Sequence, residues 1–206
     1  MMLEAKNLEK VYTNGLFSRT PTFSLSANFS IEGPGIVGLM GPNGSGKTTL
    51  FELITGSNNP TSGSVLVDGK NIHDVRTDQR DRLAIHYHQS YQVRHFRSLK
   101  PNALLQPAGC EYPLVHLFDE PQFNTQDGYI GFMLDFFRKL RDEGRLVFLC
   151  VHPNEKFHLE ILQEVCESFI FVQSGTVTTH NDYADLISKK DVQNYLGKLL
   201  LEEVAA

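Results

Sequence analysis

Eight consecutive residues, 41–48, have the types and the spacing of a loop that binds phosphate. They read Gly-Pro-Asn-Gly-Ser-Gly-Lys-Thr and match the pattern G-x-x-x-x-G-K-[ST] at every fixed position. The glycines let backbone N–H groups curl around an anion, and Lys47 supplies a mobile cation for the β and γ phosphates. The hydroxyl of Thr48 is the expected Mg²⁺ ligand. We predict that the nucleotide contacts are made by Gly41, Pro42, Asn43, Gly44, Ser45, Gly46, Lys47, Thr48 and Thr49.

Two acids that follow a short apolar run could complete this chemistry. Residues 114–118 read Leu-Val-His-Leu-Phe, and Asp119 and Glu120 come directly after them. An apolar strand that ends in two acids beside phosphates suits metal-assisted hydrolysis, in which one carboxylate holds Mg²⁺ and the other polarises the attacking water. We therefore expect Asp119 to hold Mg²⁺ and Glu120 to be catalytic.

The elements that must position these residues alternate along the chain. A strand is expected before the phosphate loop and a helix after it, and a helix is expected over 129–142, before Gly144. We expect Asn154 to cap a helix that runs to residue 166, and a helix over 183–203. Strands are expected at 3–12, 22–31, 35–40, 63–69 (an edge strand), 82–88, 114–118, 145–151, 168–173 and 176–179. This alternation predicts an α/β fold with a mostly parallel sheet and an antiparallel β portion at the N-terminal side.

The composition narrows the class of protein. The 206 residues are 41% hydrophobic and 21% charged, with a formal net charge of −5, which is typical of a globular chain and argues against a dedicated nucleic-acid binder. No apolar run approaches the ~20 residues that a membrane span needs. The first 30 residues lack the pattern of a signal peptide, and three cysteines without metal-like spacing favour reduced thiols. We therefore expect a cytoplasmic protein.

Taken together, these motifs resemble the ATPase subunits of ABC (ATP-binding cassette) transporters. Residues 41–49, GPNGSGKTT, are close to that family's Walker A loop, and residues 117–121, LFDEP, are similar to its Walker B strand with the catalytic glutamate. The resemblance implies a P-loop NTPase core of the RecA-like type, with ATP and Mg²⁺ as cofactors. It covers roughly residues 1–90 and 114–180.

The same resemblance assigns roles to single residues. Tyr12 matches the aromatic residue that stacks on adenine, and Gln89 matches the Q-loop glutamine, which reaches Mg²⁺ and the attacking water. His152 matches the switch histidine that contacts the γ-phosphate, and Asp127 is the candidate for the D-loop aspartate. Each residue also has a plainer interpretation: Tyr12 as an ordinary strand aromatic, Gln89 as a polar strand end, and His152 as a hydrogen-bonded histidine at a strand terminus.

One part of the family pattern is missing. ABC ATPases carry a helical subdomain with an LSGGQ signature between the Q-loop and the Walker B strand. Here Leu114 lies 25 positions after Gln89, the sequence LSGGQ does not occur, and three helices of ~11 residues with their connections would need at least about 40 residues. We expect a nucleotide-binding domain over 1–180, in which residues 90–113 replace the helical subdomain, and a C-terminal helical extension over 181–206.

The segment 90–113 also holds a basic cluster, Arg94, His95, Arg97 and Lys100. It is either a solvated loop face, a replacement phosphate contact across a dimer, or a site for an acidic partner. His86 and His88 alternate on one expected strand and fit a polar strand face better than a metal site. His116 lies inside the expected Walker B strand, where an apolar residue is usual, and no function follows from the sequence.

The resemblance implies an ATP hydrolase with weak or partner-dependent activity. The first hypothesis is an ATPase subunit of an ABC transport complex. A second ABC ATPase would donate the signature motif, and a membrane permease would hold the complex at the inner face of the membrane. The alternative is a non-transport ATP-dependent switch or assembly factor of the same superfamily. A DNA-repair-type ATPase is a weaker third candidate, and a homodimer stays open.

Overall fold

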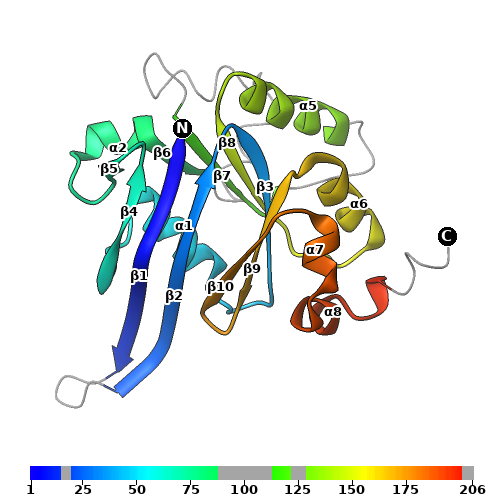
Figure 1. The fold of residues 1–206 in the computed structure, drawn as a ribbon, viewed down its shortest axis with the longest axis horizontal. Helices are drawn as coiled ribbons and strands as arrows, with labels where there is room; N and C mark the ends of the chain where they lie inside the picture. The colour runs from blue at the N-terminus through cyan, green and yellow to red at the C-terminus, as the bar shows by residue number, and fades with distance from the viewer. Residues whose placement is uncertain (15–19, 88–112, 122–128, 201–206) are drawn as a thin grey trace.

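The computed structural model describes residues 1–14, 20–87, 113–121 and 129–200 (Figure 1). In these ranges the strands are β1 (Met2–Asn14), β2 (Thr20–Glu32), β3 (Gly35–Met40), β4 (Ser62–Val67), β5 (Lys70–Asn71), β6 (Ala84–Tyr87), β7 (Val115–Asp119), β8 (Leu146–Cys150), β9 (Ser168–Gln173) and β10 (Thr176–His180). The helices are α1 (Lys47–Thr55), α2 (Thr77–Leu83), α5 (Tyr129–Asp142), α6 (Lys156–Val165), α7 (Tyr183–Ser188) and α8 (Lys190–Leu196).

All ten strands form one mixed sheet, with the order β5-β4-β1-β2-β10-β9-β3-β8-β7-β6. The part from β9 to β6 is parallel, whereas β5, β4, β1 and β2 pair antiparallel. The expected fold class is therefore confirmed: an α/β core with a mostly parallel sheet and an antiparallel N-terminal part. Because β3 and β7 are both neighbours of β8, the residues after these three strands meet at one edge of the sheet.

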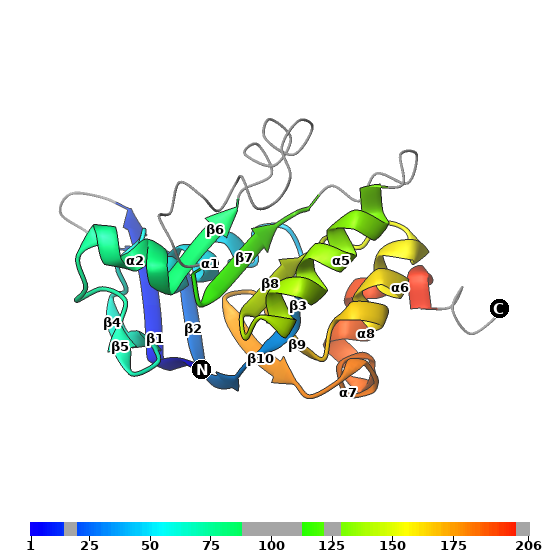
Figure 2. The same ribbon diagram turned by 90° about the horizontal axis from the view of Figure 1, so that it is seen from above.

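Alternation along the parallel strands divides the core into two clusters, one on each face of the sheet. In β3, Ile36 and Met40 face the cluster that helices α5, α6, α7 and α8 cover, while Val37 and Leu39 face the cluster that contains α1. Both faces of a parallel sheet are buried in this way, which explains why β3 and β8 are apolar at nearly every position. Figure 2 shows α5 and α6 on one side of the sheet, with β1, β2 and β4 grouped around α1.

Several predicted elements need correction. The strand expected over 82–88 begins later, because Arg82 and Leu83 close helix α2 and β6 pairs with β7 only from Ala84 onward. The strand expected over 63–69 is not an edge, since β4 pairs with β1 on one side and with the two-residue strand β5 on the other. These pairings depend on partners far away in the sequence, so local periodicity could not reveal them.

Two helix predictions also change. Glu155, not Asn154, occupies the N-cap of α6, and it has extended backbone angles and no side-chain cap bond. The single helix expected over 183–203 is interrupted within the described residues, because Lys189 is extended (φ −81°, ψ 131°) between α7 and α8 and Gly197 ends α8. Residues 201–203 of the expected helix lie outside the described residues. Both helices pack on the core that β3 and β8 share, and the domain boundary after residue 180 stays a prediction.

Candidate nucleotide site

The phosphate loop connects β3 to α1 and folds around its own backbone. Gly41, Gly44 and Gly46 have φ values of 151°, 74° and 112°, in a region that side-chain-bearing residues rarely adopt. At Gly41 a Cβ atom would lie 2.0 Å from the carbonyl oxygen of Val172, so only glycine fits there. The loop conformation is thus specified by its glycines, as the motif predicts.

The N-terminus of α1 is open toward the same loop. Gly46 caps the helix without a side-chain bond, and the first turn contains no acidic residue. The first N–H groups of a helix have no partner inside the helix, and the positive end of its dipole attracts anions. This end of α1 can therefore bind a phosphate group.

Lys47 is the cation of the loop. Its Nζ donates to the carbonyl oxygens of Gly41 (2.7 Å) and Pro42 (2.9 Å), and only 8% of the residue is exposed. Two of the three N–H donors of the ammonium group are therefore used within the loop. The third can donate to an anion that the loop binds.

The two acids differ in their surroundings. Asp119 ends β7 and is 6% exposed, and its Oδ2 lies 3.3 Å from both the hydroxyl of Thr48 and Nε2 of His86. Glu120 is exposed and has a left-handed backbone with φ 49°, fixed by a hydrogen bond from its N–H to the carbonyl of Cys150 (2.9 Å). Strained backbone of this kind is common where a side chain must be aimed at a ligand.

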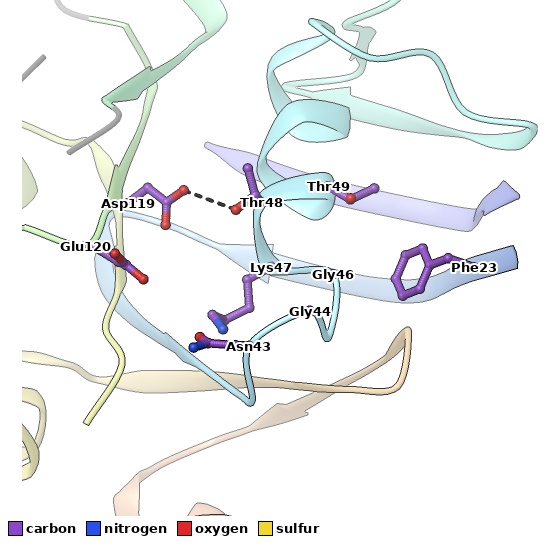
Figure 3. Close-up of a pocket in the computed structure, with 9 residues that line it drawn as sticks. All are labelled: Phe23, Asn43, Gly44, Gly46, Lys47, Thr48, Thr49, Asp119 and Glu120. Carbon is purple, nitrogen blue, oxygen red and sulfur yellow. Dashed lines mark hydrogen bonds between the residues drawn. The ribbon is translucent and has the colours of Figure 1, made fainter. Parts of the chain in front are cut away.

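A pocket of about 330 Å³ joins these groups, within the range of small-molecule sites. Figure 3 shows Asp119 and Glu120 at one end of it and Phe23 at the other, with the phosphate loop and the start of α1 between them. The lining residues are Phe23, Asn43, Gly44, Gly46, Lys47, Thr48, Thr49, Asp119 and Glu120.

The residues present fit a triphosphate and Mg²⁺. The buried hydroxyl of Ser45 has no hydrogen-bond partner among the described residues, which suits a site that a ligand completes. A hydroxyl and a carboxylate, Thr48 and Asp119, are the oxygen donors that Mg²⁺ prefers.

Tyr12 lies beside the pocket but is not among its lining residues. In the β1–β2 hairpin Tyr12 is paired with Phe23, and their ring centroids are 6.2 Å apart. The Tyr12 hydroxyl accepts from Asn58 (2.7 Å), and Nζ of Lys10 lies 5.1 Å from the ring centroid. Phe23, which the sequence analysis did not single out, lines the pocket because it extends the buried face of β2 beyond Leu25.

His152 follows β8 and is half-buried, outside the lining of the pocket. Its Nδ1 lies 3.0 Å from the hydroxyl of Tyr195. Gln89 and Asp127, the two other residues with predicted roles, lie outside the described residues, as does the basic cluster of 94–100. The roles of Tyr12, Gln89 and His152 remain predictions.

Cys150 is a second residue that the sequence analysis missed. It ends β8 fully buried, and burial, reinforced by the negative charge of Asp119, raises the pKa of its thiol well above the usual value. The thiol is therefore neutral at physiological pH and lies beside Asp119. Only the pairing of β7 with β8, which sets Asp119 opposite Cys150, makes this contact visible.

Part of the chain is similar to a known protein family. Residues 25–104 match the family described as ABC transporter. The chain is 47% identical over 73 residues to the ATP-binding protein ChvD of Rhizobium radiobacter, a match that spans 35% of this chain and 23% of that protein. The chain therefore corresponds to less than a quarter of the length of this relative.

A longer match covers most of this chain and most of the relative. A putative ABC transporter ATP-binding protein of Pyrococcus abyssi is 23% identical over 241 aligned positions, which cover 94% of this chain and 88% of that protein. This chain has only 206 residues, so at least 35 of the aligned positions have no counterpart in it. Over the aligned region, this chain is therefore shorter than the Pyrococcus abyssi protein.

The fold agrees with solved structures. The chain is 19% identical to an ATP-binding subunit of an ABC transporter, with a TM-score of 0.68 over 99% of this chain and 100% of that one. Its TM-score against the ADP conformation of MJ1267, an ATP-binding cassette of an ABC transporter, is 0.69 at 16% identity, over 95% and 98% of the two chains. Within the described ranges, no helix is both long and apolar enough to span a membrane.

Proposed function

We propose that this chain is a shortened relative of the ABC transporter ATP-binding proteins, to which it is similar over residues 25–104 and in its fold, and that it binds Mg-ATP and hydrolyses it. One observation carries the proposal. The loop that can cradle a triphosphate, a carboxylate beside the Thr48 hydroxyl, and a second carboxylate that is free to reach solvent all line a single pocket.

The residues in and beside the pocket have distinct roles in the proposed reaction. The backbone of the loop and Lys47 bind the triphosphate, and the base extends toward Phe23 and its neighbour Tyr12. Thr48 and Asp119 would hold Mg²⁺, which when bound would neutralise charge on the phosphate oxygens. Glu120 accepts a proton from water as the water oxygen bonds to the γ-phosphorus and the bond to ADP breaks.

We further propose that efficient turnover needs a second ABC ATPase. The chain contains no LSGGQ sequence, so a dimer of identical chains would lack the signature donors. When a site loses a hydrogen-bond donor to the negative charge that develops in the transition state, the rate of the reaction commonly falls by a factor of roughly 10²–10³. A solved relative has been described as a dimer in a post-hydrolysis state with ADP and phosphate. A mixed dimer would supply the signature to the ATP of this chain.

The first test separates binding from chemistry. Glu120→Gln removes the proton acceptor and keeps the shape of the side chain, so the variant is expected to bind Mg-ATP with unchanged affinity while phosphate release stops. Glu160→Gln, an exposed substitution on α6, is the control and should behave as the wild type. A Glu120→Gln variant that still releases phosphate would remove Glu120 from the mechanism, and a wild type that does not bind Mg-ATP would refute the function.

The second test concerns the partner. The Glu120→Gln variant with Mg-ATP is expected to stay monomeric in light scattering, and to form a heterodimer when an ABC ATPase that carries LSGGQ is added. A membrane permease that co-purifies with the pair favours an ABC transport complex. The alternative, a non-transport switch or assembly factor, is favoured by the short segment between Gln89 and Leu114, and soluble partners alone would support it.

A further inference from the structure

Tyr195 connects the C-terminal helices to two parts of the nucleotide site. It lies on α8, half-buried, and its ring packs against Phe171 of β9 and against His152, with ring centroids 5.7 Å and 6.1 Å apart. The hydroxyl lies 3.0 Å from Nδ1 of His152 and near the backbone of Gly41. Tyr195 thus bridges α8 and the residue that follows β8, close to the first residue of the phosphate loop.

The donors and acceptors of this bridge give it a direction. Burial, together with nearby Cys150, raises the pKa of Tyr195 to about 12. The hydroxyl therefore keeps its single hydrogen at neutral pH. A phenol hydroxyl is a better hydrogen-bond donor than acceptor, and Nδ1 of His152 is the only acceptor near it among the described contacts, so the hydrogen points at Nδ1.

A neutral imidazole carries one hydrogen, on either of its two nitrogens, and a hydrogen bond at one nitrogen selects the tautomer. If Nδ1 accepts, Nε2 must carry the hydrogen. We propose that Tyr195 is a positioning residue, which holds His152 as the Nε2–H tautomer so that this N–H can donate to the γ-phosphate of ATP. The second half of this statement rests on the proposed function, whereas the tautomer itself does not.

The bridge also explains how the C-terminal helices contribute to the site. Val192 and Leu196 of α8 are buried in the core, so the helix that carries Tyr195 is fixed to the same core cluster as Ile36 and Met40 of β3. The hydroxyl is thereby held at a set distance from His152, and it orders the imidazole before nucleotide arrives. Such preorganisation of donors is what stabilises charge in a transition state.

The decisive experiment measures the tautomer directly, without nucleotide. Protein labelled with ¹⁵N-histidine gives long-range ¹H–¹⁵N correlations that distinguish the two tautomers of each of the eight histidines, and the signals of His152 are assigned as those missing from His152→Gln. The wild type is expected to show the Nε2–H form, and Tyr195→Phe a mixture of both. Tyr183→Phe, on the neighbouring helix α7, should leave the spectrum of His152 unchanged. An Nδ1–H form in the wild type, or an unchanged tautomer in Tyr195→Phe, would overturn the proposal.

The second readout uses turnover, with the partner ATPase if turnover requires it. Loss of one hydrogen bond at the imidazole predicts a kcat for Tyr195→Phe about 3- to 10-fold lower, with KM for ATP within about twofold. In the His152→Gln background the same substitution should have no further effect, because the two residues act as one unit. Independent, multiplicative losses would contradict positioning through His152. If the wild type shows no hydrolysis at all, the proposed function fails, while the tautomer still decides the role of Tyr195.

Discussion

Individual residues in the pocket contribute to the proposed reaction through different physical effects. Lys47 is bound by two carbonyl oxygens of its own loop, so its charge is positioned before any ligand enters. Asp119 is buried between Thr48, His86 and Cys150, and its geometry is fixed from three sides. Glu120 is exposed on a strained backbone. The first two groups are suited to binding, and the third is suited to moving a proton.

At this scale we predict the effect of Lys47→Ala. Charge-assisted hydrogen bonds to phosphate are worth about 1.5–3 kcal/mol, so the affinity for Mg-ATP should fall roughly 10- to 100-fold, as measured by titration calorimetry. Lys70→Ala, an exposed lysine on β5, is the matched control and should bind as the wild type does. Circular dichroism establishes that Lys47→Ala is folded, and an unchanged affinity in the folded variant would refute a role for the Nζ group.

At the scale of elements, the β9–β10 hairpin supports the phosphate loop. The N–H of Gly175, in the turn of this hairpin, donates to the carbonyl oxygen of Ser45 (3.0 Å), and its own carbonyl accepts from the N–H of Ser26 (2.7 Å). A Cβ atom at Gly175, where φ is 78°, would lie 1.8 Å from the carbonyl oxygen of Ser24. The turn therefore contacts both β2 and the loop through backbone atoms that leave no space for a side chain.

This arrangement predicts a difference between two glycines with nearly the same backbone angle. Gly69 has φ 74°, and a Cβ there would meet no atom within 4 Å, so Gly69→Ala should lower the free energy of unfolding by only about 1–2 kcal/mol, the left-handed backbone penalty. The free energy of unfolding should fall clearly more in Gly175→Ala, because β2 or the phosphate loop must move as well. The affinity of this variant for Mg-ATP should also fall. Urea denaturation compares the two variants. Equal losses would mean that the hairpin does not support the loop.

At the scale of the whole molecule, the buried His116 affects how stability depends on pH. It lies in β7 with no exposed surface, its ring is parallel to that of Tyr87 (centroids 5.8 Å apart), and its Nδ1 lies 3.1 Å from the Tyr87 hydroxyl. Burial above all, and the positive charge of Arg145, lower the pKa of His116 from 6.5 to about 3. The histidine therefore stays neutral in the folded protein over the physiological pH range.

The sign of the effect follows from linkage. Between pH 6.5 and 3 the unfolded chain binds a proton at His116 that the folded chain does not, so stability falls as the pH falls, by up to about 1.4 kcal/mol per pH unit. When the pH is lowered from 7 to 5, the free energy of unfolding of His116→Phe should fall by about 2 kcal/mol less than that of the wild type, as measured by urea denaturation. Some pH dependence should persist, because burial also lowers the pKa of His73, His158 and His180. An unchanged pH dependence would contradict a buried neutral His116.

The amino-acid sequence alone determined the parts of this protein that depend on neighbouring residues. The glycines of 41–48 set the loop conformation through their own φ angles, and the apolar runs before the loop and before Asp119 are buried as strands β3 and β7. Parallel strands with this spacing also indicated the fold class. These features are local, so the neighbouring residues of each pattern are sufficient to predict the structure that they form.

Only the tertiary structure decided which distant residues meet at the site. Phe23, Cys150 and Tyr195 come from β2, β8 and α8, and no local pattern in the sequence relates them to residues 41–48. The helix expected over 183–203 is interrupted at Lys189, and Tyr195 lies on α8, after this interruption. The physical reason is that such contacts depend on strand pairing and on which buried face each helix covers, which are properties of the packed chain as a whole.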